Sequence, residues 1–229
     1  MPLSEHMKEL RSRVMTAIIP IIILTLLVFV YSGELLLIIW KQTMPVDVSL
    51  MMNIYSPMEL IITKLKLSLM FALFLGAPLL IYQIFMFVGK GLYENEKLFF
   101  IKVVPLSFIL FVTGAALAYF IVVPLVFKYT ILYSTEATPK ISIIRAISTI
   151  TTLVMGFGLI FQFPLVLIFA LRIGLLKPDY LKQKRKIIYG MLFALAFFIS
   201  PDPSVVSEIV VAIILIILFE FSLFMARLL

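Results

Sequence analysis

The chain has no cysteine, one histidine and few charged residues, and each shortage removes a class of function. Without cysteine there is no disulfide, thiolate nucleophile or cysteine metal site, and the redox compartment is left undetermined. The single histidine is His6, and the sequence contains no Gly-x-Ser-x-Gly, Walker or His-Glu-x-x-His pattern. These gaps argue against a histidine-dependent hydrolase, and we expect neither enzymatic activity nor a cofactor.

Charged residues make up 14% of the chain, whereas 63% of residues are hydrophobic and the mean hydropathy is +1.20. That balance is far more apolar than a soluble domain allows, so it indicates an integral membrane protein with the lipid bilayer as its solvent. A net charge of +7 could suggest a nucleic-acid partner. The Lys and Arg residues lie between apolar runs, however, which is typical of topology signals, and we expect no nucleic acid.

Six apolar segments predict an all-α membrane protein with six transmembrane helices in a single domain, residues 1–229. Four uncharged runs contain 20, 23, 25 and 26 residues. Each can cross a ~30 Å hydrocarbon core at about 1.5 Å per residue. The fifth run has only 15 uncharged residues, and the sixth has 18 residues but contains Glu220. The predicted approximate spans are 14–39, 62–88, 99–127, 146–174, 186–201 and 205–226.

The distribution of positive charge predicts the orientation. Of the 19 Lys and Arg residues, 13 lie in segments on the same side of the membrane as the N-terminus. The positive-inside rule therefore places both termini in the cytoplasm, in a multi-pass protein of the cell membrane. The first apolar run lacks a small-x-small cleavage site, so we interpret it as a retained helix.

Several prolines fall inside or at the margins of the apolar runs. They predict kinked helices that form a concave bundle, with ordinary tolerance of proline in membrane helices as the alternative. These residues are Pro20, Pro78, Pro105, Pro124 and Pro164.

A few polar residues lie where a membrane protein rarely places them. Gln162 is midway along the fourth run, and Glu220 is within the sixth, where an unpaired carboxylate is costly. Gln162 could equally make an interhelical hydrogen bond that holds the bundle. Glu94 and Glu96 lie in a short turn, 87–97, where a membrane surface normally carries Lys and Arg.

An ordered set of motifs resembles the TatC family, the multispanning receptor subunit of the twin-arginine protein translocase. The first is Pro2-Leu-Ser-Glu-His-Met-Lys-Glu-Leu-Arg-Ser-Arg13, which is similar to the family's N-terminal signature. The others follow in order: Ser56-Pro57-x-Glu59; Tyr82-Gln83 with Phe87 and Leu92-Tyr93-x-x-Glu96; Gly114-x-x-x-Ala118-Tyr119-Phe120 with Pro124; Phe157-Gly158-x-x-Phe161-x-x-Pro164; and Ser200-Pro201-Asp202 followed by Phe219-Glu220.

The resemblance implies a receptor for signal peptides that carry consecutive arginines, on proteins exported already folded. It implies that Glu9 and Glu96 hold the arginine pair, and that other residues shape or support the same surface. It further implies single-span TatA/TatB-type subunits and other TatC copies as partners. The supporting residues are Leu10, Arg11, Phe87, Leu92 and Tyr93; structural or partner-contact roles fall to Pro57, Gln162, Pro164, Asp202 and Glu220.

Two other classes stay open from the residues alone. A small-solute secondary transporter would be expected to show inverted repeats and charges near the midplane, and no clear repeat occurs. A membrane enzyme would need a nucleophile and a base facing each other at depth. Hydroxyl groups are present at Ser148, Thr149, Thr151 and Thr152, but no base is evident.

Overall fold

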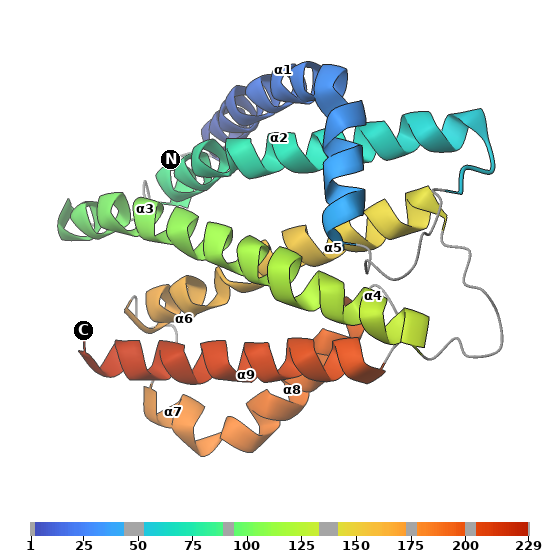
Figure 1. Ribbon diagram of the computed structural model, residues 1–229. Helices are drawn as coiled ribbons and strands as arrows, with labels where there is room; N and C mark the ends of the chain where they lie inside the picture. Colours follow the sequence, from blue (N-terminus) through green and yellow to red (C-terminus); the bar gives the residue numbers. More distant parts are fainter. Residues whose placement is uncertain are drawn as a thin grey trace. The chain divides into compact units, whose positions relative to one another are not determined.

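The computed structural model describes residues 3–43, 53–88, 94–132, 142–172, 178–199 and 205–228. These residues are almost entirely helical, apart from one isolated β-bridge between Asn53 and Ser142 (Figure 1). Their contacts cluster into two compact units, which we call unit 1 (Met1–Val112 with Lys140–Thr151) and unit 2 (Thr113–Pro139 with Thr152–Leu229). The elements are α1 Leu3–Thr43, α2 Pro57–Val88, α3 Glu94–Leu117, η2 (a π-helical segment) Ala118–Val122, α4 Val123–Leu132, α5 Ile143–Ile160, α6 Phe163–Arg172, α7 Pro178–Gln183, α8 Arg185–Ile199 and α9 Val205–Leu228.

Four stretches of the described chain are long and apolar enough to cross a membrane: Arg11–Thr43, Pro57–Ile84, Val104–Lys128 and Ile143–Leu171. They overlap the first four predicted spans, so the prediction of a helical membrane protein is confirmed at that level. Helix α8 has 15 residues, which corresponds to about 22 Å and is shorter than a ~30 Å core. The count of six spans and the cytoplasmic termini stay predictions.

Unit 1 is built on the packing of α1 along α2. Gly76 on α2 allows a close approach, because a Cβ atom there would lie 3.1 Å from the Ile21 side chain on α1. Helix α3 packs on α2 from another side, with the rings of Phe74 and Phe111 5.9 Å apart. Figure 1 shows that α1 and α3 begin, and α2 ends, at the same end of this unit. We call it the N-terminal end of unit 1.

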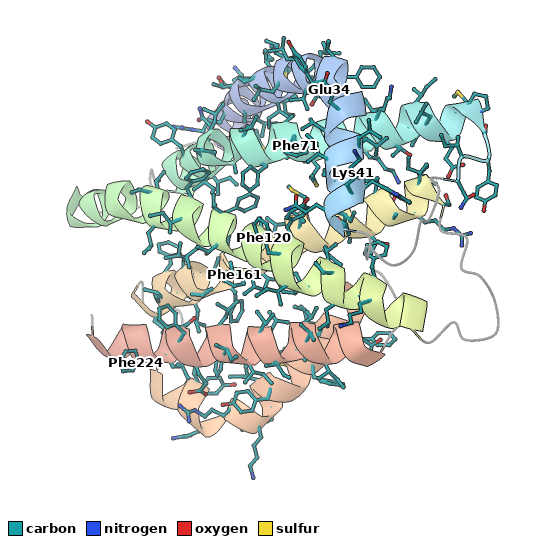
Figure 2. All side chains as sticks on the ribbon, in the orientation of Figure 1. Glu34, Lys41, Phe71, Phe120, Phe161 and Phe224 are labelled. Carbon is teal, nitrogen blue, oxygen red and sulfur yellow. The ribbon has the colours of Figure 1, made fainter. Side chains whose placement is uncertain are left out.

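Helix α1 changes direction partway along its 41 residues. Figure 2 labels Glu34 and Lys41 on the part of α1 that crosses α2. The bend follows Ser32 and Gly33, and the Ser32 hydroxyl donates to the carbonyl oxygen of Phe29 at 2.6 Å. A Ser-Gly pair of this kind weakens the helical hydrogen-bond ladder and is a common cause of a kink.

Within unit 2, Gly114 brings the last turns of α3 against α5. A Cβ atom at this position would lie 2.6 Å from the carbonyl oxygen of Phe157 and 2.7 Å from the ring of Phe161. Phe157 itself is fully buried. Glycine is therefore required here for a close helix crossing.

The predicted kinking of helices by proline is confirmed at Pro164, and the concave bundle stays a prediction. Helix α5 ends at Ile160 and α6 begins at Phe163, because the Pro164 ring conflicts with the carbonyl group four residues earlier, that of Ile160. Pro124 is the second residue of α4, which follows the π-helical segment. The other prolines, Pro20, Pro78 and Pro105, lie inside continuous helices. At these positions the alternative holds, since membrane helices commonly tolerate proline.

Substitution of Gly114 by alanine tests the helix crossing. Gly114→Ala is expected to lower the free energy of unfolding by roughly 1–3 kcal/mol, since the new methyl group meets a backbone oxygen that cannot rotate away. The measurement is thermal unfolding of the detergent-solubilised protein. Gly190→Ala is the matched control, because nothing lies within 4 Å of a Cβ atom there. Equal unfolding temperatures for the two variants would contradict the close crossing.

Candidate functional site

A polar contact joins α1 and α2 near the N-terminal end of unit 1. The Nη1 atom of Arg13 donates to the Oε1 atom of Gln83 at 3.4 Å. Glu9 is one helical turn before Arg13, and Phe87 is one turn after Gln83. Because α1 and α2 run in opposite directions, both residues lie beyond this contact toward the same end.

Contacts between the helices provide common reference levels, and the position of each predicted site residue along its helix axis follows from its distance to such a level. Ile21 and Gly76 lie side by side, and Glu9 and Phe87 are about 18 Å and 16 Å from that level at 1.5 Å per residue. The ring contact of Phe74 with Phe111 relates α3 to α2 in the same way. Glu96 is about 22 Å from Phe111 along the axis of α3. Phe74 is about 3 Å farther from this end than Gly76, so the backbones of Glu9, Phe87 and Glu96 reach similar heights, within roughly 3 Å.

The acidic residues Glu94 and Glu96 are in the first turn of α3 rather than in an irregular turn, because α3 begins at Glu94. Carboxylates are favoured there by the unsatisfied N–H groups and the positive end of the helix dipole. Residues 89–93 separate α2 from α3, so Val88 and Glu94 are at most about 23 Å apart.

The structure describes only part of the predicted binding surface. Arg11 is exposed on α1. Glu9, Leu10, Phe87 and Glu96 have helical backbones, and their side chains lie outside the described part of the chain. Leu92, Tyr93 and Asp202 lie outside the described residues altogether.

Glu59 is missing from the predicted site. Of the described carboxylates in unit 1, it forms the most hydrogen bonds. It lies in the first turn of α2 and is 9% exposed. Its Oε2 atom accepts from the Tyr55 backbone N–H at 2.8 Å. Its Oε1 atom accepts from the Ser142 hydroxyl and, at 3.4 Å, from the Ile144 backbone N–H.

These contacts make Glu59 a cap for two helices at once. Tyr55 is two residues before the start of α2, and Ser142 and Ile144 flank the first residue of α5. The Ile143 N–H also donates to the Asn53 carbonyl oxygen at 3.2 Å, which ties the same two chain segments together. The sequence signal was the spacing Ser56-x-x-Glu59, a capping box at the start of a helix, with Pro57 at the first helical position.

Gln162 lies at the break between α5 and α6. Its backbone N–H donates to the Leu159 carbonyl oxygen at 2.9 Å. Its own carbonyl oxygen accepts from the N–H groups of Leu165 and Val166 at 3.0 and 3.1 Å. The backbone of Gln162 thus supplies the first hydrogen bonds of α6, where Pro164 has no N–H to contribute.

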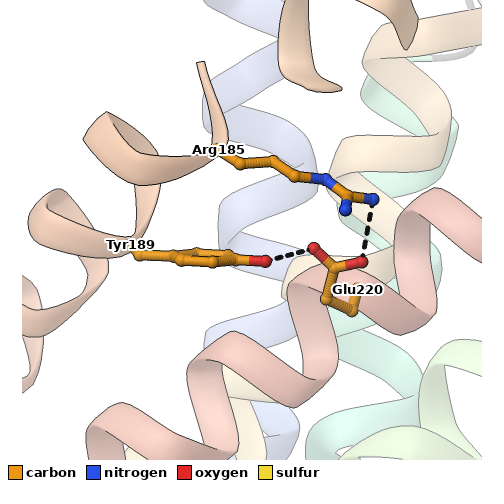
Figure 3. A network of polar contacts seen from close by, with 3 residues as sticks. All are labelled: Arg185, Tyr189 and Glu220. Atoms are coloured by element: carbon orange, nitrogen blue, oxygen red, sulfur yellow. Dashed lines mark hydrogen bonds and ion pairs between the residues drawn. The ribbon is translucent and has the colours of Figure 1, made fainter. Parts of the chain in front are cut away.

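Glu220 on α9 forms a polar network with two residues of α8 in unit 2 (Figure 3). The Nη2 atom of Arg185 lies 3.0 Å from the Oε2 atom of Glu220, and both side chains are 38% exposed. The Tyr189 hydroxyl donates to Oε1 of the same carboxylate, and its ring meets that of Phe219 edge to face at 6.0 Å. Glu220 is therefore a paired charge that fastens α8 to α9.

The described side chains include no group of three or more histidine or acidic residues that could hold a metal ion. The polar contacts described here fix helix ends and helix pairs. In the described chain they form no arrangement of nucleophile and base.

Replacing Glu59 tests its role at the two helix starts. Glu59→Ala is expected to lower the free energy of unfolding by roughly 2–4 kcal/mol, since two N–H groups and a hydroxyl lose a shared acceptor. Glu59→Gln should cost less, because one oxygen acceptor is retained. Thermal unfolding in detergent measures both, with Glu34→Gln as a control, since Glu34 is exposed on α1. A Glu59→Ala protein as stable as the control would rule out the double cap.

A double-mutant cycle tests the Arg185–Glu220 pair. Glu220→Gln and Arg185→Gln are each expected to lower the free energy of unfolding by about 1 kcal/mol. The double variant should lose less than the sum of the two, because the ion pair is already gone after the first substitution. Glu208→Gln on the same helix is the control. Strict additivity of the two substitutions would show that the pair contributes no coupling energy.

Comparison with known proteins gives a consistent result over nearly the whole chain. Residues 5–213 match the family model described as "Sec-independent protein translocase protein (TatC)". The TatC protein of Methanocella arvoryzae is 39% identical over 99% of this chain and 94% of its own. That of Aquifex aeolicus is 33% identical over 100% of this chain and 95% of its own.

Solved structures give the same family. A crystal structure titled as the twin arginine translocase receptor TatC in DDM has a TM-score of 0.84 and 31% identity, covering 96% of this chain and 99% of that one. A second TatC crystal structure has a TM-score of 0.82 and 32% identity, covering 97% and 98%. The chain therefore belongs to the TatC family, the multi-pass membrane components of the Sec-independent protein translocase, which are not enzymes.

Proposed function

We propose that this chain is the receptor of the translocase for twin-arginine signal peptides, and that carboxylates at the N-terminal end of unit 1 bind the arginine pair. The observation that supports this proposal is the antiparallel packing of α1, α2 and α3. It brings the backbones of Glu9, Phe87 and Glu96 to similar heights at one end of unit 1, although Glu9 and Glu96 are 87 positions apart in the chain.

The chemistry of the arginine side chain suits a pair of carboxylates. A guanidinium group is planar and permanently charged, and it pairs with a carboxylate through two parallel hydrogen bonds, whereas a lysine ammonium cannot form that fork. Glu9 and Glu96 would each hold one arginine. Leu10, Arg11, Phe87, Leu92 and Tyr93 would shape and support the surface around them.

The proposed orientation places this end in the cytoplasm. It rests on the excess of Lys and Arg in segments on the side of both termini, in a chain of six predicted spans. Signal peptides would then reach the site before their cargo crosses the membrane. The apolar stretch of the signal peptide would lie along the concave bundle that the prolines predict.

The proposed partners follow from membership of the translocase. They are signal peptides of folded cargo, single-span TatA/TatB-type subunits and other TatC copies, which would contact the outer faces of the helices. Pro57, Gln162, Pro164, Asp202 and Glu220 would act as structural or partner-contact residues. The contacts of Glu220 with Arg185 and Tyr189 support a structural role for this residue.

A peptide-binding measurement tests the arginine site. A signal peptide with two arginines is expected to bind the detergent-solubilised protein at least about tenfold more tightly than its two-lysine counterpart. Glu9→Gln and Glu96→Gln should each remove most of that preference, as measured by fluorescence anisotropy of a labelled peptide. Glu94→Gln is the control, because Glu94 lies in the same helical turn but is not a proposed ligand. Equal binding of the lysine peptide would overturn the proposal.

A further inference from the structure

Two cations face the same seam between α2 and α5 in unit 1, away from the proposed arginine site. Lys66 on α2 is exposed, and its Nζ atom donates to the Ser148 hydroxyl on α5 at 2.8 Å. Arg145 is exposed on α5, three residues before Ser148. Side chains three residues apart lie on the same face of a helix, with Cβ atoms about 5–6 Å apart. Lys66 and Arg145 therefore border one patch of the seam.

The described carboxylates leave this positive charge uncompensated. Neither Lys66 nor Arg145 forms an ion pair with a described acidic side chain. On the same face of α2 as Lys66, Glu59 is seven residues earlier, which is about 10 Å along the axis. Its carboxylate is already occupied by Tyr55, Ser142 and Ile144. Lys64 points to the other side of α2, toward Gly33 of α1.

Lys66 lies near one edge of the span, within reach of the headgroups. Helix α2 has 32 residues, or about 48 Å, and when centred it exceeds a ~30 Å core by about 9 Å at each end. Lys66 is nine residues from Pro57, about 13 Å along the helix and so roughly 4 Å inside the core. A lysine side chain reaches about that far back toward the headgroups.

Apolar side chains beside Lys66 suit the acyl chain of a lipid. Ile62 and Leu69, four residues before and three after Lys66, are 38% and 43% exposed and lie on the same face of α2. A ligand at the seam would thus meet two cations and a hydroxyl at its polar end, with Ile62 beside them and Leu69 deeper in the core. Two like charges near hydrocarbon that no described carboxylate compensates are unfavourable unless an anion joins them.

We propose that Lys66, Arg145 and Ser148 bind the phosphodiester group of an anionic phospholipid in the leaflet at the end of unit 1 where α2 begins. Lys66 and Arg145 supply the charge, and the Ser148 hydroxyl orients the Lys66 ammonium. Arginine adds a planar pair of donors that fits two phosphate oxygens. The site depends on the chain spanning a membrane and is independent of signal-peptide binding.

Native mass spectrometry of the full chain in detergent tests this site, with phosphatidylglycerol as the probe. We expect phosphatidylglycerol to be retained more tightly than phosphatidylcholine. Lys66→Gln and Arg145→Gln should each weaken phosphatidylglycerol binding by about fivefold, which corresponds to one cation near a lipid surface. Lys186→Gln, at an exposed lysine of α8 in unit 2, should leave binding unchanged.

Two further measurements separate phosphate recognition by the lipid site from helix packing and from binding of a soluble anion. Ser148→Ala removes the hydrogen bond but keeps both charges, so it should preserve most of the binding; a loss as large as that of Lys66→Gln would mean that helix packing, not phosphate recognition, is responsible. Inorganic phosphate should not displace the lipid at matched concentration. Displacement would identify a soluble anion as the ligand. Equal retention of phosphatidylcholine, or an equal effect of Lys186→Gln, would also overturn the proposal. If Lys66→Gln fails to fold, Lys66→Arg, which keeps the charge, and Arg145→Gln decide the outcome.

Discussion

One carboxylate holds together the starts of two helices that are about 85 residues apart in the chain. Glu59 accepts hydrogen bonds from groups at the start of α2 and the start of α5, where helices have N–H donors with no partner of their own. Without such an acceptor these donors would need water, which is scarce beside an apolar bundle. The Lys66–Ser148 hydrogen bond repeats the connection two turns further along α2. The two contacts fix the register between α2 and α5.

The same principle recurs in unit 2 with other residues. The Gln162 carbonyl starts the hydrogen bonding of α6 after the break that Pro164 imposes. The Glu220 carboxylate accepts from two residues of α8. In a membrane protein the hydrophobic effect does little to join one apolar helix to another, because lipid chains are as apolar as the side chains they replace. Polar contacts and close glycine crossings such as that at Gly114 therefore determine which helices pair.

Much of this could be predicted from the sequence, and the rest depended on contacts between distant segments. Runs of uncharged residues predicted the first four long apolar helices, because hydrocarbon leaves a segment of that length few alternatives to a helix. The break at Pro164 was also predictable, since proline has a fixed local effect.

The prediction that Glu94 and Glu96 lie in a turn was wrong, because a short loop and the start of a helix look alike in sequence. Glu59 was missed because its main partners, Ser142 and Ile144, lie on a segment far away in sequence. The charge partner of Glu220 was equally invisible until α8 and α9 were seen side by side.

The Arg185–Glu220 pair has a consequence for how the chain enters the membrane. Helix α8 is short for a span, and α9 carries a carboxylate whose transfer into lipid is costly while it is unpaired. Once Arg185 and Glu220 have met, their opposite charges offset one another and the cost of transfer into lipid falls for both helices. On the prediction of six spans, α8 and α9 would then enter the membrane as a pair rather than one by one. Biogenesis of this part of the protein would wait until both helices have been synthesised.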